Sequence, residues 1–76
     1  MDKIDSYELI NSVHRVVIRR DVATRKRLIL FISFYEKNGS IEPKYTYRVY
    51  NIHERIVSVG SHLHSAIKVY NNLINY

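Results

Sequence analysis

The segment from Arg25 to Tyr35 constrains the fold of this chain more than any other part of the sequence. Three cations lead directly into an eight-residue run, Leu-Ile-Leu-Phe-Ile-Ser-Phe-Tyr, in which Ser33 is the only residue that is neither apolar nor aromatic. Because alternate side chains of a strand point to opposite faces, a strand built from this run is apolar on both sides. Something must therefore cover a second face: an N-terminal segment, a second copy of the chain, or a partner.

The length of 76 residues predicts one small domain, residues 1–76, with a small core. A core of this size supplies about 3–5 kcal/mol of stability, and the absence of cysteine excludes disulfides and thiolate metal sites. The apolar runs are shorter than the ~20 residues of a membrane span, and the start lacks a secretory pattern. We therefore expect a protein of the cytoplasm, without a membrane partner. Plentiful isoleucine, tyrosine and asparagine indicate AT-rich coding, as in phages and other mobile elements, and the location is then the host cytoplasm.

The N-terminal third of the sequence predicts a helical turn followed by a strand. Apolar residues at a spacing of three suit a short helical turn near residues 5–11. A strand near 12–20 follows from a cluster of stiff β-branched side chains, namely Val13, Val16, Val17 and Ile18. The alternative is one continuous helix over residues 6–20.

The middle of the chain predicts two more strands with turns between them. We expect a turn at 21–24, a strand at about 26–36, and a turn around Asn38-Gly39, which tolerates the positive φ of a tight hairpin. Pro43 has no N–H to donate to a ladder, so the connection is expected to continue to residue 44. Aromatic and β-branched residues then predict a third strand over 45–50.

The last part of the sequence predicts a turn at 51–54, a short strand at 55–59 and a helix capped by Ser61. The helix has one apolar stripe, made of Leu63, Ala66, Ile67, Tyr70, Leu73 and Ile74. The predicted fold is α+β, a three- to four-stranded antiparallel meander with this amphipathic helix packed on one face. The helix is expected to cover the side of the sheet formed by Leu28, Leu30, Ile32 and Phe34, together with Val16 and Ile18.

Positive charge is concentrated in one part of the chain. The formal net charge is +5, and half of the Lys and Arg residues lie in a short basic segment, which contains Arg15, Arg19, Arg20, Arg25, Lys26 and Arg27. The second sheet face is expected to add aromatic and arginine side chains from strands two and three, with candidates Phe31, Tyr35, Tyr47, Arg48 and Tyr50. Whether Tyr47 or Tyr50 joins this face depends on a register that the pattern leaves open.

Cations that hold phosphates beside rings that stack on bases are the chemistry of nucleic-acid binding. The sequence therefore predicts a small, basic, non-enzymatic module that engages nucleic acid or a nucleoprotein complex. The first alternative is a mobile-element inhibitor or adaptor that occludes an acidic host protein, for example a CRISPR effector of host defence. The second alternative is an obligate homodimer with a structural role.

Catalytic and cofactor chemistry have little support in the sequence. No cysteine nucleophile, close carboxylate pair or phosphate-cradling glycine loop is present. The four histidines lack zinc-ligand spacing, so we expect no metal and no cofactor. The C-terminal helix has few cations on its polar side, which is not typical of a helix that lies on a membrane.

Overall fold

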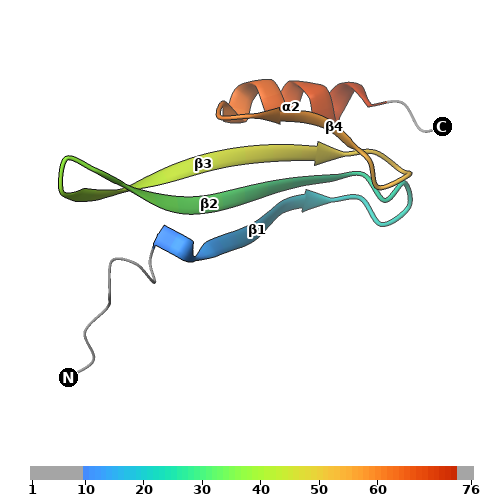
Figure 1. The fold of residues 1–76 in the computed structure, drawn as a ribbon. Helices are drawn as coiled ribbons and strands as arrows, with labels where there is room; N and C mark the ends of the chain where they lie inside the picture. The colour runs from blue at the N-terminus through green and yellow to red at the C-terminus, as the bar shows by residue number, and fades with distance from the viewer. Residues whose placement is uncertain (1–9, 74–76) are drawn as a thin grey trace.

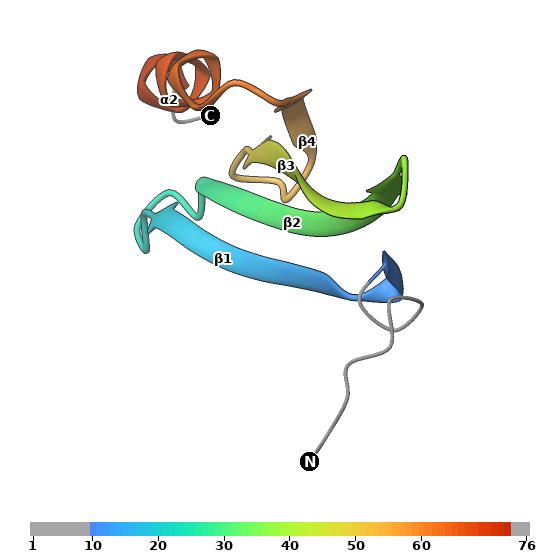
Figure 2. The same ribbon diagram turned by 90° about the vertical axis from the view of Figure 1, so that its left-hand side faces the viewer.

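The computed structural model describes residues 10–73. Its elements are β1 (Val13–Arg20), β2 (Arg27–Lys37), β3 (Ser40–Tyr50), β4 (Ile56–Gly60) and α2 (Leu63–Asn72), as Figure 1 shows. The strands form one antiparallel sheet in the order β1-β2-β3-β4, and α2 packs on one side of it (Figure 2). This confirms the predicted α+β meander with a C-terminal helix.

The N-terminal prediction is confirmed only in part. Residues 13–20 form a strand, so the alternative of one helix across 6–20 is wrong. Residues 10 and 11 are helical, and the rest of the predicted helical turn lies outside the described residues. The β-branched side chains of β1 favour an extended backbone over a helix.

The β2–β3 hairpin is tighter than the sequence predicted. Asn38 and Gly39 have φ values of 52° and 80° and form a two-residue turn, after which Lys37 pairs with Ser40. Pro43 was expected to lie outside the ladder, but it pairs with Phe34 inside β3. Strand β4 pairs only with the part of β3 from residue 47 onward. The outer side of β3 at Pro43 therefore has no neighbouring strand among the residues that the structure describes, and the missing N–H is tolerated there.

The β1–β2 and β3–β4 connections, at the opposite end of the sheet, are stabilised by the same kind of hydrogen bond. Oδ1 of Asp21 accepts the N–H groups of Ala23 at 2.9 Å and Thr24 at 3.2 Å. In the β3–β4 connection, Oδ1 of Asn51 accepts the N–H groups of residues 53 and 55 at 2.9 and 3.0 Å. Short polar side chains that bond to the following backbone stabilise turns. Each loop is therefore held in one conformation by the residue that opens it.

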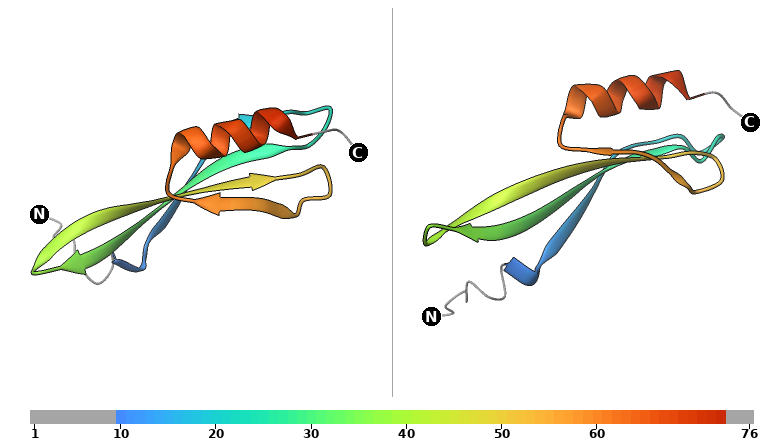
Figure 3. Two further views of the ribbon diagram at one scale, coloured as in Figure 1. Left: turned by 90° about the horizontal axis from the view of Figure 1, so that it is seen from above. Right: turned by 45° about the horizontal axis from the view of Figure 1, so that its top comes forward.

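The helix α2 covers one end of the sheet rather than its whole length. Ten residues of helix extend about 15 Å, whereas the eleven residues of β2 extend about 37 Å. The views in Figure 3 show the β2–β3 hairpin projecting beyond α2. The core cluster consists of Leu28, Val49, Ala66 and Tyr70, with Tyr47, Val69 and Leu73 packed against it.

Two predictions about the helix are therefore corrected. Leu30, Ile32 and Phe34 are only half-buried and lie outside the core cluster, because α2 is too short to reach along β2. Ser61 does not cap the helix, since His62 occupies the N-cap position without a side-chain hydrogen bond. The predicted residue Ile74 lies outside the described part of the chain.

Strand β1 is an edge strand that is exposed along its whole length. Its apolar side chains Val13, Val16, Val17 and Ile18 are 62, 45, 50 and 41 % exposed. The expectation that α2 covers Val16 and Ile18 is therefore wrong, because α2 packs against β2, β3 and β4. A register shift between Val17 and Arg19 also places Arg19 opposite Leu28, on the helix side.

Candidate nucleic-acid interface on the open face of the sheet

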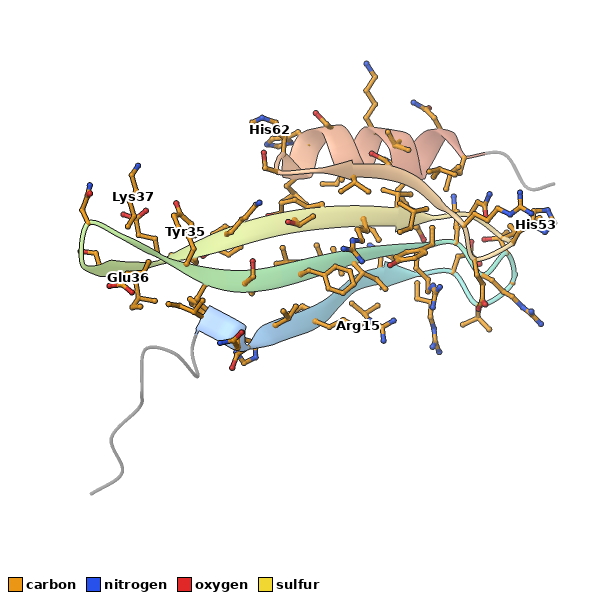
Figure 4. All side chains as sticks on the ribbon, in the orientation of Figure 1. Arg15, Tyr35, Glu36, Lys37, His53 and His62 are labelled. Carbon is orange, nitrogen blue, oxygen red and sulfur yellow. The ribbon has the colours of Figure 1, made fainter. Side chains whose placement is uncertain are left out.

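Within residues 10–73, no helix packs on one face of the sheet, which we call the open face. Leu28 and Val49 pair with one another beneath α2, so the neighbouring pair, Ile29 with Arg48, points to the opposite side. Cross-strand pairing then assigns the open face to Val13, Arg15, Val17, Arg20, Arg27, Ile29, Phe31, Ser33, Tyr35, Lys37, Ser40, Glu42, Lys44, Thr46, Arg48, Tyr50, Ile56 and Val59. Figure 4 shows Arg15 on β1 on the side of the sheet away from α2.

Two arginines on the open face lie over aromatic rings. Cζ of Arg48 is 4.4 Å from the ring centroid of Phe31, and Cζ of Arg27 is 4.7 Å from that of Tyr50. Guanidinium groups over aromatic faces are attracted by the ring quadrupole, at about 0.5–1 kcal/mol where exposed. The two stacks flank Ile29, which is only 1 % exposed although no helix of the described part of the chain lies over it. The arginines and their rings therefore serve as the cover of this face.

These arginines have no carboxylate partner. Within residues 10–73, neither Arg27 nor Arg48 forms an ion pair, and the Nε atom of each is buried without a hydrogen-bond acceptor. Arg27 also lies directly opposite Arg20 across the β1–β2 ladder. Like charges that are directly opposite destabilise a sheet. The open face thus carries positive charge that the described part of the protein does not neutralise.

The charge on the open face is not uniform along the strands. The one carboxylate that pairing assigns to this face is that of Glu42, whose Oε2 accepts a hydrogen bond of 3.0 Å from the hydroxyl of Tyr35. That bond to a carboxylate raises the pKa of Tyr35 above its ordinary value. Tyr35 lies near the hairpin tip, at the far end of the molecule from His53 (Figure 4). The arginines of this face therefore lie between Arg15 and the loops, whereas Lys44, Lys37 and the one carboxylate lie toward the hairpin tip.

The structure divides the residues that the sequence singled out. It brings Arg15, Arg20, Arg27, Phe31, Arg48 and Tyr50 together on the open face, with Tyr35 farther out on the same face. It places Arg25 in the β1–β2 loop. Three residues are on the helix side instead, namely Arg19, Lys26 and Tyr47.

Each of the three displaced residues has a clear structural cause. The bulge in β1 turns Arg19 to the helix side. Tyr47 pairs with Leu30 and packs against the core cluster, so the register assigns Tyr50 rather than Tyr47 to the open face. Lys26 lies over the ring of Tyr70, with Nζ 4.5 Å from the centroid.

Sequence analysis did not identify Lys44 or Glu54 as part of this region. Lys44 pairs with Ser33 and so belongs to the open face. Its parity could have been counted once the hairpin turn was known. Glu54 lies in the β3–β4 loop beside the β1–β2 loop, and both border the same hollow. No local pattern predicts that two loops far apart in the sequence meet.

In residues 10–73, no group of three or more His, Cys, Asp or Glu side chains is placed to hold a metal ion. No helix in the described part of the chain is both long and apolar enough to cross a bilayer. Comparison of the chain with protein-family models, with curated proteins and with solved structures found no match.

Proposed function

We propose that this protein is a non-enzymatic module that binds single-stranded nucleic acid, alone or in a nucleoprotein complex, across the open face. The observation that supports it is the pair of stacks, Arg48 on Phe31 and Arg27 on Tyr50, neither of which has a carboxylate partner among residues 10–73. A sheet face with several cations and one carboxylate favours a polyanion. A partner with flat aromatic groups and negative charge can interact with both the ring and the guanidinium group of each stack.

The binding mode follows from the position of the guanidinium groups. Cζ of each group lies over an aromatic ring of the open face, and in the proposed mode an unpaired base stacks beside this pair. The terminal nitrogens donate charge-assisted hydrogen bonds to phosphate oxygens. Arg15 and Arg20 on the neighbouring strand β1 extend the cationic track beside the stacks. The protein thus holds the backbone by charge and the bases by stacking, without reading their edges.

The salt dependence of binding to a labelled, mixed-sequence DNA or RNA single strand tests this proposal. Each phosphate that the protein neutralises releases counterions, so affinity falls steeply between about 50 and about 300 mM salt. Arg27→Gln or Arg48→Gln removes one contact and lowers the slope of log K against log salt by about 0.7. Lys68→Gln, which makes the same charge change at an exposed position of α2, leaves the slope unchanged. An affinity that stays constant across this salt range overturns the proposal.

The first alternative uses the same face against an acidic host protein, which the module occludes as an inhibitor or adaptor. Aromatic and arginine side chains are enriched among the residues that dominate protein interfaces. Dissociation is then slow, and affinity depends on buried contacts more than on salt. An acidic protein that binds the purified chain with this behaviour, while single strands do not bind, selects the alternative.

A homodimer is favoured by a separate observation, the exposure of β1. A long edge strand with four exposed β-branched residues offers a template for another strand. A second copy can pair with it antiparallel about Val16, which places Val16 beside Val16 of the other copy and Arg15 opposite Val17. The dyad is then perpendicular to the sheet, so both open faces point the same way. The homodimer is thus compatible with nucleic-acid binding and doubles the number of strands that form the face.

A further inference from the structure

A small hollow lies at the loop end of the open face. Its volume is about 160 Å³, and it is lined by Arg20, Asp21, Val22, Arg25, Arg27 and Glu54. The three arginines come from the end of β1, the β1–β2 loop and the start of β2, and the glutamate comes from the β3–β4 loop. Arg27 belongs both to this hollow and to the stack on Tyr50. The hollow is therefore continuous with the stacking surface.

Both loops present a strained residue at this hollow. Arg25 has a φ of 63° and Glu54 a φ of 62°, in the left-handed region that side chains other than glycine adopt at a cost. Backbone hydrogen bonds maintain each conformation: Arg25 N–H donates to the carbonyl of Asp21 at 2.7 Å, and Glu54 N–H donates to the carbonyl of Asn51 at 3.0 Å. The loop backbone thereby sets the direction of the Cα–Cβ bond of both residues.

The charged groups around the hollow differ in whether they have partners. The Asp21 carboxylate accepts backbone N–H groups, and the bond from Thr24 above all lowers the pKa of Asp21 from its ordinary value. None of the three arginines forms an ion pair within residues 10–73, and Arg20 and Arg27 face one another as like charges. An anion placed between them removes this repulsion. Guanidinium groups also match phosphate oxygens with paired hydrogen bonds.

We propose that this hollow seats the terminal phosphate of a nucleic-acid strand bound on the open face. A phosphomonoester carries a charge of about −1.5 to −2 at neutral pH and three acceptor oxygens, whereas an internal phosphodiester carries one charge. Three converging arginines at the end of the stacking surface fit the group with more charge and more acceptors. The inference rests on the proposed function for the identity of the polymer, and it adds that binding selects strand ends.

Three oligonucleotides of one sequence test the seat, with a 5′-phosphate, a 3′-phosphate or two terminal hydroxyls. The phosphorylated end that fits binds about tenfold more tightly than the dihydroxyl strand, the size expected for a hydrogen-bonded charged group. Comparing the 5′ and 3′ arms identifies which end enters. Arg25→Asn removes this preference while keeping a residue that tolerates a positive φ. Lys37→Gln, at the distant hairpin tip, keeps the preference.

Glu54 supplies a test with the opposite sign. Its carboxylate repels an incoming phosphate, so Glu54→Gln strengthens the preference for the phosphorylated strand by several-fold. Glu36→Gln, which makes the same charge change at the hairpin tip, leaves the preference unaltered. Loss in one variant and gain in the other cannot both arise from damage to the fold.

The failure of this inference is distinguishable from the failure of the proposed function. Equal, salt-sensitive affinity for all three strands overturns the phosphate seat and leaves the proposed function in place. Inorganic phosphate is then titrated into the protein and followed by amide chemical shifts. Shifts confined to residues 21–27 and 51–55, with no oligonucleotide binding, support the seat and overturn the proposed function. No shifts at these residues, together with equal affinities, overturn the seat by both measurements.

Discussion

Lys26 and Tyr70, 44 residues apart in the chain, meet at the end of α2, where the Lys26 ammonium donates a 3.2 Å hydrogen bond to the carbonyl oxygen of Tyr70. The same ammonium lies 4.5 Å from the centroid of the Tyr70 ring. The last turn of α2 contains no basic residue of its own, so the β1–β2 loop supplies the cation that a helix C-terminus favours. Lys26 therefore joins the helix to the sheet and contributes to stability rather than to the open face.

Replacing Lys26 is expected to reduce stability more than binding, whereas replacing its neighbour Arg27 is expected to reduce binding more than stability. Lys26→Met lowers the free energy of unfolding by about 1 kcal/mol, because it removes a cation–π contact and a cation at a helix terminus. Arg27→Met weakens single-strand binding with a smaller loss of stability. Urea denaturation and fluorescence anisotropy measure the two effects. Equal loss of binding in both variants would return Lys26 to the interface.

Truncating Leu28 is expected to unfold much of the population. Leu28 is 2 % exposed in the core cluster, and a buried Leu→Ala substitution costs about 2–5 kcal/mol. The whole domain has about 3–5 kcal/mol to lose. Ile67→Ala in α2 serves as the control, because Ile67 is 37 % exposed, and it lowers the free energy of unfolding much less. Circular dichroism on heating checks both, and a fully cooperative transition for Leu28→Ala near that of the wild type would contradict the assigned core.

The stacking rings are expected to contribute to binding independently of charge. Phe31→Leu or Tyr50→Leu weakens the affinity for a single strand, by up to about 1–3 kcal/mol for each base that loses a stacking partner. Leucine preserves the apolar cover over Ile29, so the fold is retained. Tyr45→Leu, a 46 % exposed ring on the helix side, leaves affinity unchanged. Equal effects at Tyr45 and Phe31 would indicate that the open face is not the binding surface.

Asp21 predicts the acid limb of the stability curve. Its folded-state pKa lies below the ordinary 3.8, chiefly because the N–H of Thr24 bonds to its carboxylate. A lowered folded-state pKa favours folding above the unfolded-state pKa, so this contribution is present above about pH 4 and is lost as the pH falls through the folded-state value. Asp21→Asn flattens this part of the curve, measured by urea denaturation at several acidic pH values. A curve that retains its slope in the variant would assign the effect elsewhere.

A single cysteine at the β1 edge tests the homodimer. The natural chain contains no cysteine, so Val16→Cys introduces a unique thiol at the proposed dyad. Opposite residues of antiparallel strands have Cα atoms about 4.5–5.5 Å apart, within the range of about 4.4–6.8 Å that a disulfide spans. Mild oxidation of Val16→Cys therefore gives a covalent dimer. Val59→Cys, 58 % exposed on the other edge strand, is the control, and equal cross-linking at both sites would contradict the β1 dyad.

The order of elements was predictable because each depends on local chemistry. Asn38-Gly39 indicated the hairpin, and β-branched runs indicated the strands. The strand bounds differ from those predicted by one residue for β1, β2 and β4. The start of β3 was missed because the cost of Pro43 depends on whether another strand lies beside it. That neighbour is set by the short length of β4, which is a property of the sheet rather than of the proline.

The face of each side chain was harder to predict than the strand that carries it. A two-residue turn fixes every pair that follows, so recognising that Lys37 pairs with Ser40 would have assigned Tyr50 to the open face and Tyr47 to the core. The bulge near Ile18 has no such marker, and it reverses the side on which Arg19 lies. A one-residue change of register moves every later side chain to the other face. Alternation alone therefore could not predict the face of both Arg15, before the bulge, and Arg19, after it.

Because α2 stops short of the hairpin tip, both faces of the outer ends of β2 and β3 are exposed to solvent. Their ladder amides are expected to exchange with deuterium sooner than those near Val49, since opening there breaks few apolar contacts. Local opening of the β2–β3 ladder thus starts at the end farthest from the arginine-lined hollow. A strand anchored in that hollow would be held by the stiff end of the molecule, while the tip moves without loosening the anchor.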